Sequence, residues 1–169
     1  EEIFKVAQGR IIASTFASLL TRIQQLIWLS EQYGRKVAIE GYSMKQNTAI
    51  ARELGYLKVK KETLVETKEI HKYPDNKITV ACTGSQGEDR SALMRIANNE
   101  HRIITLHPTD SVIFSSSAVP GNENTVQRVK DSLYKRAGKI YHYQNMDIHA
   151  GGHAKADEMR DLFDLLKPK

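Results

Sequence analysis

Short apolar runs alternate along this chain with longer segments in which apolar residues recur every three or four positions. The runs are rich in β-branched residues and lie between turn residues, which is typical of buried strands. The longer segments have the period of amphipathic helices, and several of them end at a glycine. Strands are therefore expected at residues 10–15, 36–40, 77–82, 103–106, 112–115 and 139–143, and helices at 17–33, at 46–54 with Ile50 and Leu54 inward, at 63–71, and around Leu93, Val129 and Leu162.

The alternation of strands and helices predicts an α/β fold. Parallel strands need helical crossovers, so the short connections favour a mostly parallel, doubly wound sheet with helices on both faces. The 169 residues are about the length of one domain, and a hydrophobic content of 40% is enough to form a core. We expect a single domain over 1–169. Residues 1–7 read as the end of a helix already under way, so we also expect a piece of a longer protein.

Three polar, glycine-bearing loops each follow the carboxyl end of an expected strand, near Thr83, Ser115 and His149. Ligands of such sheets bind beyond the carboxyl ends of the strands. Gly84 and Gly87 expose backbone N–H groups that suit an oxyanion, and the serines of the second loop add hydroxyl groups. Each loop alone could be an ordinary turn. Their convergence on one edge of the sheet is what predicts an anion site.

Composition and charge add modest constraints. There are 25 Lys and Arg residues against 20 Asp and Glu, and the resulting charge of +5 favours a polyanionic partner without naming one. Cys82 is the single cysteine and lies in an expected buried strand, so a structural role in a reducing, cytoplasmic compartment is predicted. No apolar run has the roughly 18 residues that a membrane span needs, and we expect no membrane partner.

His149 and His153 flank two glycines just before an amphipathic helix. Imidazole titrates near neutrality, so the pair could move a proton or neutralise a phosphate, although a tight turn with solvated histidines would have the same sequence. The spacing offers only two zinc ligands, and no cluster elsewhere completes a zinc site. The other histidines that stand apart in the sequence are expected on the surface or with satisfied hydrogen bonds: His71, His101, His107 and His142. Trp28 is expected to pack against the fold, and stacking of its indole on a base is the less common alternative.

Several motifs, in this order, resemble the β-CASP domain of ribonuclease J, a family within the metallo-β-lactamase superfamily of RNA-processing nucleases. The resemblance covers nearly the whole chain. The motifs that carry it are Ala17-Ser18 with Arg22-Ile23-Gln24-Gln25, Thr83-Gly84-Ser85-Gln86-Gly87-Glu88, Ser115-Ser116-Ser117 with Pro120-Gly121-Asn122-Glu123, His149-x-x-Gly152-His153, and Leu166-Lys167-Pro168-Lys169.

The resemblance implies a larger enzyme in which this domain faces a metallo-β-lactamase domain across an RNA-binding cleft. That other domain would hold two zinc ions, and the enzyme would act as a 5′-to-3′ exoribonuclease that favours 5′-monophosphate ends and as an endoribonuclease. The full-length parent would be a homo-oligomer. His153 and His149 would be catalytic, with His153 stabilising charge or protonating the leaving oxygen. The implied phosphate-binding residues are His149, Ala150, Gly151, Gly152, His153, Thr83, Gly84, Ser85, Gln86, Gly87, Glu88, Ser115, Ser116, Ser117 and Asn122.

The family's H-x-H-x-D-H zinc motif is absent from this sequence, so no metal ligand is predicted within it and the chain alone is expected not to hydrolyse RNA. The chain also departs from the family at four positions. Glycine stands at 151 in place of serine, Leu19 and Thr21 stand where asparagine and histidine are usual, and Asp89 replaces proline. The first three bear on recognition of a 5′-phosphate. Two alternatives are a stand-alone, non-catalytic RNA- or phosphate-binding domain and a small-molecule phosphate enzyme.

Overall fold

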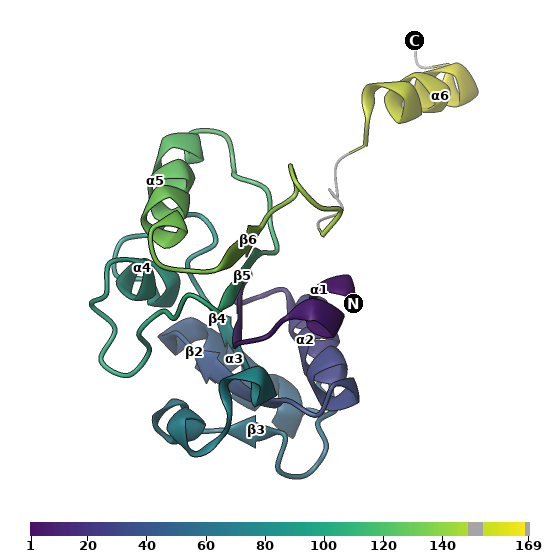
Figure 1. The fold of residues 1–169 in the computed structure, drawn as a ribbon. Helices are drawn as coiled ribbons and strands as arrows, with labels where there is room; N and C mark the ends of the chain where they lie inside the picture. Colours follow the sequence, from purple (N-terminus) through teal and green to yellow (C-terminus); the bar gives the residue numbers. More distant parts are fainter. Residues whose placement is uncertain (149–153, 168–169) are drawn as a thin grey trace.

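The computed structural model describes residues 1–148 and 154–167, and its centre is one sheet of six parallel strands (Figure 1). The strand order is β3-β2-β4-β1-β5-β6. The strands are β1 (Ile11–Ser14), β2 (Lys36–Glu40), β3 (Leu64–Val65), β4 (Ile78–Cys82), β5 (Ser111–Phe114) and β6 (Lys139–Tyr141). The helices are α1 (Glu2–Val6), α2 (Leu20–Gln32), α3 (Tyr42–Glu53), α4 (Ala92–Ala97), α5 (Glu123–Tyr134) and α6 (Ala156–Leu166), with 3-10 turns η1 (Thr67–Lys72) and η2 (Asp75–Lys77).

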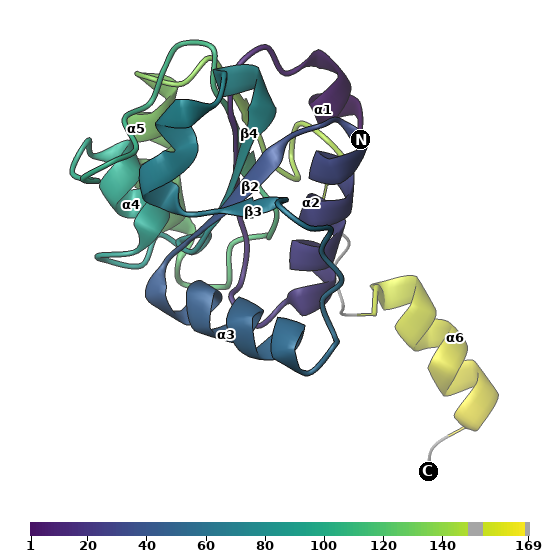
Figure 2. The ribbon, with the colours of Figure 1, turned by 90° about the horizontal axis from the view of Figure 1, so that it is seen from below.

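Helices cover both faces of the sheet, which confirms the predicted doubly wound α/β fold. One apolar core lies between the sheet and helices α4 and α5, and the other lies between the sheet and helices α1 to α3 (Figure 2). Every residue of the central strands β1 and β4 is buried. Because these strands are covered on both sides, they read as continuous apolar runs, and each fully buried Ile or Val contributes about 1.5–3 kcal/mol.

Helix α3 differs from the prediction in both its start and its inward face. It begins at Tyr42, directly after Gly41, whose φ of 103° lets the chain turn out of β2. The inward face is set by Met44, Thr48 and Ala51. Ile50 and Leu54 were expected to face the core and instead point outward, with 55% and 65% of their surfaces exposed. Met44 lies before the expected start of the helix, so the expected range of 46–54 left out the first residue of the stripe that is buried.

Residues 103–106 do not form the expected strand. Their backbone groups bind side chains instead of a neighbouring strand: His101 Nδ1 accepts from the N–H groups of Ile103 and Ile104, and the carbonyl of Thr105 accepts from the Arg10 guanidinium. Ile104 is fully buried, which explains the apolar signal. The helix expected over 63–71 is likewise wrong, because the short edge strand β3 and the 3-10 turn η1 occupy this segment.

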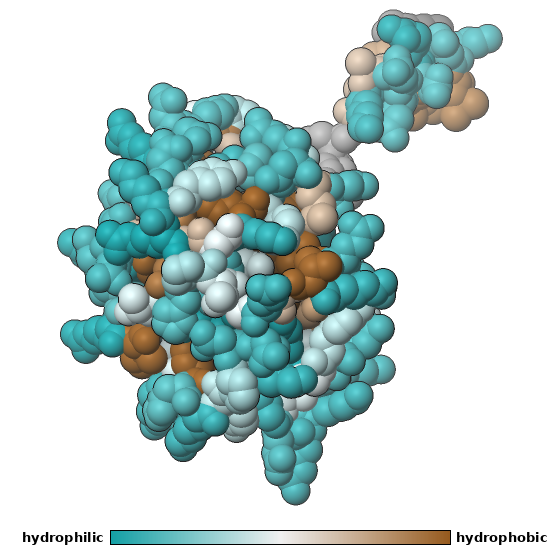
Figure 3. Space-filling view, in the orientation of Figure 1, coloured by the Kyte–Doolittle hydropathy of each residue, from teal (hydrophilic) through white to brown (hydrophobic). Residues whose placement is uncertain are grey.

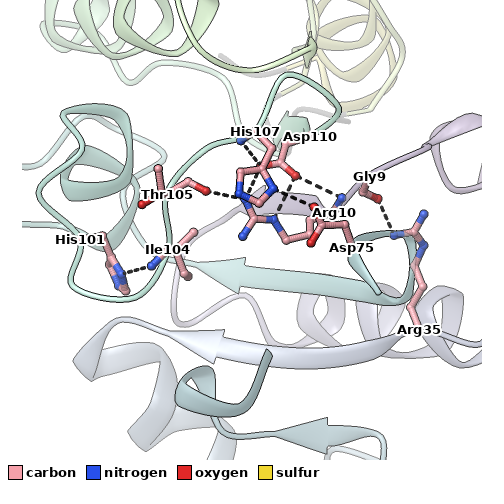
Figure 4. Close-up of polar contacts among 9 residues, drawn as sticks. All are labelled: Gly9, Arg10, Arg35, Asp75, His101, Ile104, Thr105, His107 and Asp110. Carbon is pink, nitrogen blue, oxygen red and sulfur yellow. Dashed lines mark hydrogen bonds and ion pairs between the residues drawn. The ribbon is translucent and has the colours of Figure 1, made fainter. Parts of the chain in front are cut away.

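Two buried arginines tie together the amino ends of the strands (Figure 4). The Arg10 guanidinium pairs with the Asp110 carboxylate at 2.6 Å. Arg35 donates to the carbonyl oxygens of Ala7, Gly9 and Ile78. Buried ionic groups need such complete pairing because desolvation is costly. These contacts fix the edge of the sheet that is opposite to the 83–88 and 115–122 loops.

Helix α6 has the predicted apolar stripe, but the rest of the chain leaves it uncovered (Figure 3). Met159, Leu162, Phe163 and Leu166 are all exposed. Trp28 also differs from its predicted packing role, because 53% of its surface is exposed on α2. Among the described residues, no helix has the length and apolar character needed to cross a membrane.

Candidate phosphate-binding edge of the sheet

The helices change from one face of the sheet to the other at the carboxyl end of β1, and open α/β sheets form their ligand crevice at such a point. This strand continues into α2 on one face of the sheet, whereas its neighbours β4 and β5 lead to α4 and α5 on the opposite face. The N–H of Thr15 donates to the carbonyl of Cys82 at 3.2 Å, and the N–H of Ser115 donates to that of Ser14 at 2.9 Å. The carboxyl ends of all three strands therefore lie side by side. Such a switch point is where open α/β sheets bind their ligands.

The 83–88 loop leaves β4 at this edge and folds as a compact turn. Gly84 and Gly87 have φ angles of 113° and 73°, which strongly favour glycine. The Glu88 carboxylate accepts from the backbone N–H of Gln86 at 3.2 Å. Thr83 Oγ1 accepts from the N–H of Ala92 at 3.4 Å, at the start of α4. The sequence signal of paired glycines thus corresponds to real turns next to a helix start.

Gln86 joins the 83–88 loop to the loop of residues 115–122 after β5. Its Nε2 atom donates to Ser116 Oγ at 3.3 Å and to the carbonyl of Ser117 at 2.9 Å. Its Oε1 atom accepts from the N–H of Val119 at 2.8 Å. The Gln86 side chain is 5% exposed, so these bonds are made out of water. The structure therefore brings together two of the three loops that were predicted to converge. The side-chain amide of Gln86 makes the connection with both its nitrogen and its oxygen.

Two buried hydroxyl groups at this edge have no hydrogen-bond partner among the described residues. They are Thr15 Oγ1, just past β1, and Ser85 Oγ, in the 83–88 loop. Buried polar groups in native proteins nearly always have a partner, so such hydroxyls are available to donate to a ligand oxygen. Sequence reasoning missed Thr15. Its position could have indicated it, because Thr15 ends the expected strand 10–15, which lies in the sheet between the strands that lead to the 83–88 and 115–122 loops.

Asn122 and the remaining serines line the second loop. Asn122 occupies the position before α5, and its side chain makes no capping bond to the helix. Ser115 and Ser116 are buried. Their hydroxyls and the side-chain amide of Asn122 give this loop several groups that can contact an oxyanion.

The third predicted loop, residues 149–153, lies outside the described residues, and so do the predicted roles of His149 and His153. The chain leading to it is well defined. The carbonyl of Ile148 accepts from the Arg22 guanidinium at 3.1 Å. Ile148, Arg22 and Ser115 also line one hollow of about 530 Å³. The chain therefore approaches the third loop beside the start of the second.

A cluster of Asp75, His107 and Asp110 is the one group within the described residues whose spacing could suit a metal ion. The Asp110 carboxylate is already engaged, because it accepts from Arg10 and from the backbone N–H of His107 at 2.8 Å (Figure 4). His107 Nδ1 lies 2.7 Å from Asp75 Oδ2. These residues form a closed network at the amino edge and do not fit a zinc site of the kind that activates water.

Glu40 supplies a compensated negative charge behind the 83–88 loop. Burial alone would raise the pKa of its carboxyl, but hydrogen bonds from His101, Lys45 and Thr67 outweigh burial and hold the pKa well below its usual range. The carbonyl of Glu40 also accepts from the N–H of Thr83 at 3.2 Å. The neighbouring Cys82 thiol is fully buried, and burial raises its pKa, which suits the structural role predicted for it.

These features define a parallel α/β domain with a hydroxyl-rich crevice at its topological switch point. The family model for the ribonuclease J β-CASP domain matches residues 8–133, which include the first two loops. The chain belongs to the ribonuclease J β-CASP domain family.

Known relatives match almost all of the chain. It is 46% identical to a Ribonuclease J of Helicobacter pylori over 100% of its length, which is 24% of that protein. It is 44% identical to a Ribonuclease J of Thermus thermophilus over 96% of its length, and 40% identical to a Ribonuclease J 1 of Streptococcus pyogenes over 99%, covering 28% and 30% of those proteins. The chain thus spans between 24% and 30% of the length of these relatives.

Proposed function

We propose that this chain forms the RNA-binding wall of a ribonuclease J-like enzyme, in which its loops grip the phosphate at the 5′ end of an RNA. The observation that carries the proposal is the union of the 83–88 and 115–122 loops by Gln86 at the switch point of the sheet. The names of the relatives support a nuclease as the parent protein. The charge of +5 favours the same polyanionic partner.

In this proposal both joined loops contribute groups that bind the phosphate. Thr83 to Glu88 and Ser115 to Ser117 line the pocket for a 5′-monophosphate, and Asn122 contributes its side-chain amide. Thr15 and Ser85 donate their unpartnered hydroxyls to the phosphate oxygens. Gln86 acts by holding the loops in register, since its amide atoms are already bonded within the protein.

The 149–153 loop would complete the pocket on its open side. His153 would stabilise the charge that develops on the scissile phosphate or protonate the leaving oxygen, and His149 would assist it. We place the two zinc ions in the portion of the parent protein that this chain does not span, because the described residues offer no suitable ligand set. The parent would be a cytoplasmic homo-oligomer with both 5′-to-3′ exoribonuclease and endoribonuclease activity.

The test is replacement of His153 in the complete protein. The His153→Ala variant is expected to lose about a hundredfold or more in turnover of 5′-monophosphorylated RNA while retaining its zinc. The matched control is His71→Ala, since His71 is exposed on η1, away from the loops. Normal turnover by the His153→Ala variant, with the zinc content unchanged, would refute the assigned role.

A further inference from the structure

Lys130 is a buried lysine that has no counter-ion in the described part of the chain. It lies on the inward face of α5, and only 6% of its surface is exposed. Its ammonium is 5.9 Å from the centre of the Phe114 ring at the end of β5. Within residues 1–148 and 154–167, Lys130 has no hydrogen-bond or ion-pair partner. Burial lowers its pKa, as expected for a cation that has lost water without gaining an anion.

His142 lies beside this lysine, one residue beyond β6. Its Nδ1 atom is sealed from solvent and lacks a partner among the described atoms. Its Nε2 atom is 3.5 Å from the hydroxyl of Tyr134, which stands four residues after Lys130 and so on the same face of α5. Burial lowers the pKa of His142, and the charge of Lys130 lowers it further. The two basic groups therefore lie close enough to repel each other.

Among residues 1–148 and 154–167, no carboxylate forms an ion pair with either member of this pair. Asp131 is the acidic residue that acts on Lys130, but it lies on the exposed face of α5 and accepts from Gln127 at 2.8 Å. An isolated buried charge destabilises a fold, and an apolar residue of similar volume would be tolerated better at this position. Titratable groups that burial and a neighbouring charge perturb in this way cluster at functional sites.

The location of the pair indicates what would bind there. Phe114 directly precedes Ser115, so Lys130 lies under the start of the 115–122 loop, and His142 follows the next strand at the same edge of the sheet. The expected ligand is therefore an anion that reaches the carboxyl ends of β5 and β6. Lysine binds phosphate as a point charge, without the planar geometry that a carboxylate–arginine pair requires.

We propose that Lys130 and His142 form a second phosphate-binding point, separate from the crevice at β1 and β4. Lys130 supplies the charge, and His142 supplies a hydrogen-bonding nitrogen. The phosphate belongs either to the backbone of a bound RNA or to a free phosphate compound. The first of these sources rests on the proposed function. The chemistry is the same in both cases, and the experiment distinguishes the two sources.

The experiment compares three variants of the complete protein. Lys130→Met removes the charge and keeps the length of the side chain, whereas Lys130→Arg keeps the charge. Lys135→Met is the matched control, because it makes the same change at an exposed position one turn later. Thermal unfolding is measured in sodium phosphate and in sodium chloride at equal ionic strength, and binding of a single-stranded RNA is measured over a range of salt.

Lys130→Met is expected to unfold at the same or a higher temperature in chloride and to lose part of the stabilisation that phosphate gives. It should bind RNA about tenfold more weakly, with the slope of log Kd against log salt reduced by about 0.7. Lys130→Arg should retain both properties, as should Lys135→Met.

Loss of the phosphate response with unchanged RNA binding would assign the point to a free phosphate compound. The phosphate measurement decides the matter even if the wild-type protein proves not to bind RNA. The proposal is overturned if Lys130→Met keeps both the phosphate response and the salt slope of the wild type.

Discussion

Removing the Gln86 side chain should release the 115–122 loop from the 83–88 loop. The Gln86→Ala variant loses the bonds to Ser116, Ser117 and Val119, all made by a side chain that is 5% exposed. Each such bond contributes about 0.5–1.5 kcal/mol net, so opening of the loop should become easier by about 2–3 kcal/mol. That change corresponds to roughly 30-fold to 150-fold faster exchange of an amide that the loop protects.

The amide of Val119 is the direct reporter, because its N–H donates to Gln86 Oε1. Hydrogen exchange of the segment that contains Val119 is measured in the complete protein, with and without the substitution. Gln127→Ala is the matched control, since that glutamine is exposed on α5 and bonds only to Asp131. Gln86→Glu is informative as well, because it keeps an acceptor for Val119 but loses the donor for Ser117. Unchanged exchange at Val119 in Gln86→Ala would refute the bridging role.

Two further predictions concern charged residues that are buried in or next to the strands of the sheet. Asp110→Asn leaves the buried Arg10 guanidinium without its charge partner and should reduce the free energy of unfolding by about 3 kcal/mol or more. The double variant Arg10→Met with Asp110→Leu removes both charges, so urea titration should find it less destabilised than Asp110→Asn. A double variant as unstable as the single one would contradict this. The folded-state pKa of Glu40 lies below its ordinary value of 4.5, so its stabilising effect is complete above pH 4.5 and is lost as the pH falls. Glu40→Gln should therefore lower stability at neutral pH and flatten the acid limb, and an unchanged acid limb in denaturation measurements would exclude this explanation.

The sequence predicts the central strands well because burial on both faces leaves a simple signal. In β4 every residue is buried, so five consecutive residues without charge mark the strand and the loop after it. The convergence of the 83–88 and 115–122 loops follows from the same reasoning, since it needs only the direction of the strands. These parts of the site depend on topology and not on individual contacts.

Other parts depend on contacts that no local pattern encodes. Ile104 is buried as a strand residue would be, but the backbone of its segment binds the side chain of the nearby His101 and that of Arg10, which is distant in the sequence. Ile50 points outward because the sheet packs against the stripe formed by Met44, Thr48 and Ala51, which is only partly apolar and so gives a weak sequence signal. The role of Gln86 as a bridge, and the isolation of Lys130 and His142, required the positions of side chains on separate elements.

The central claim is that the joined loops hold the phosphate at the 5′ end of an RNA. The most direct measurement is a structure of the complete protein with a 5′-monophosphorylated, 2′-O-methylated oligonucleotide that resists cleavage. The account predicts that the terminal phosphate lies within hydrogen-bond distance of the 83–88 loop and of Ser115 or Ser116. An RNA whose 5′-phosphate is bound elsewhere, with these loops in contact only with solvent, would contradict it.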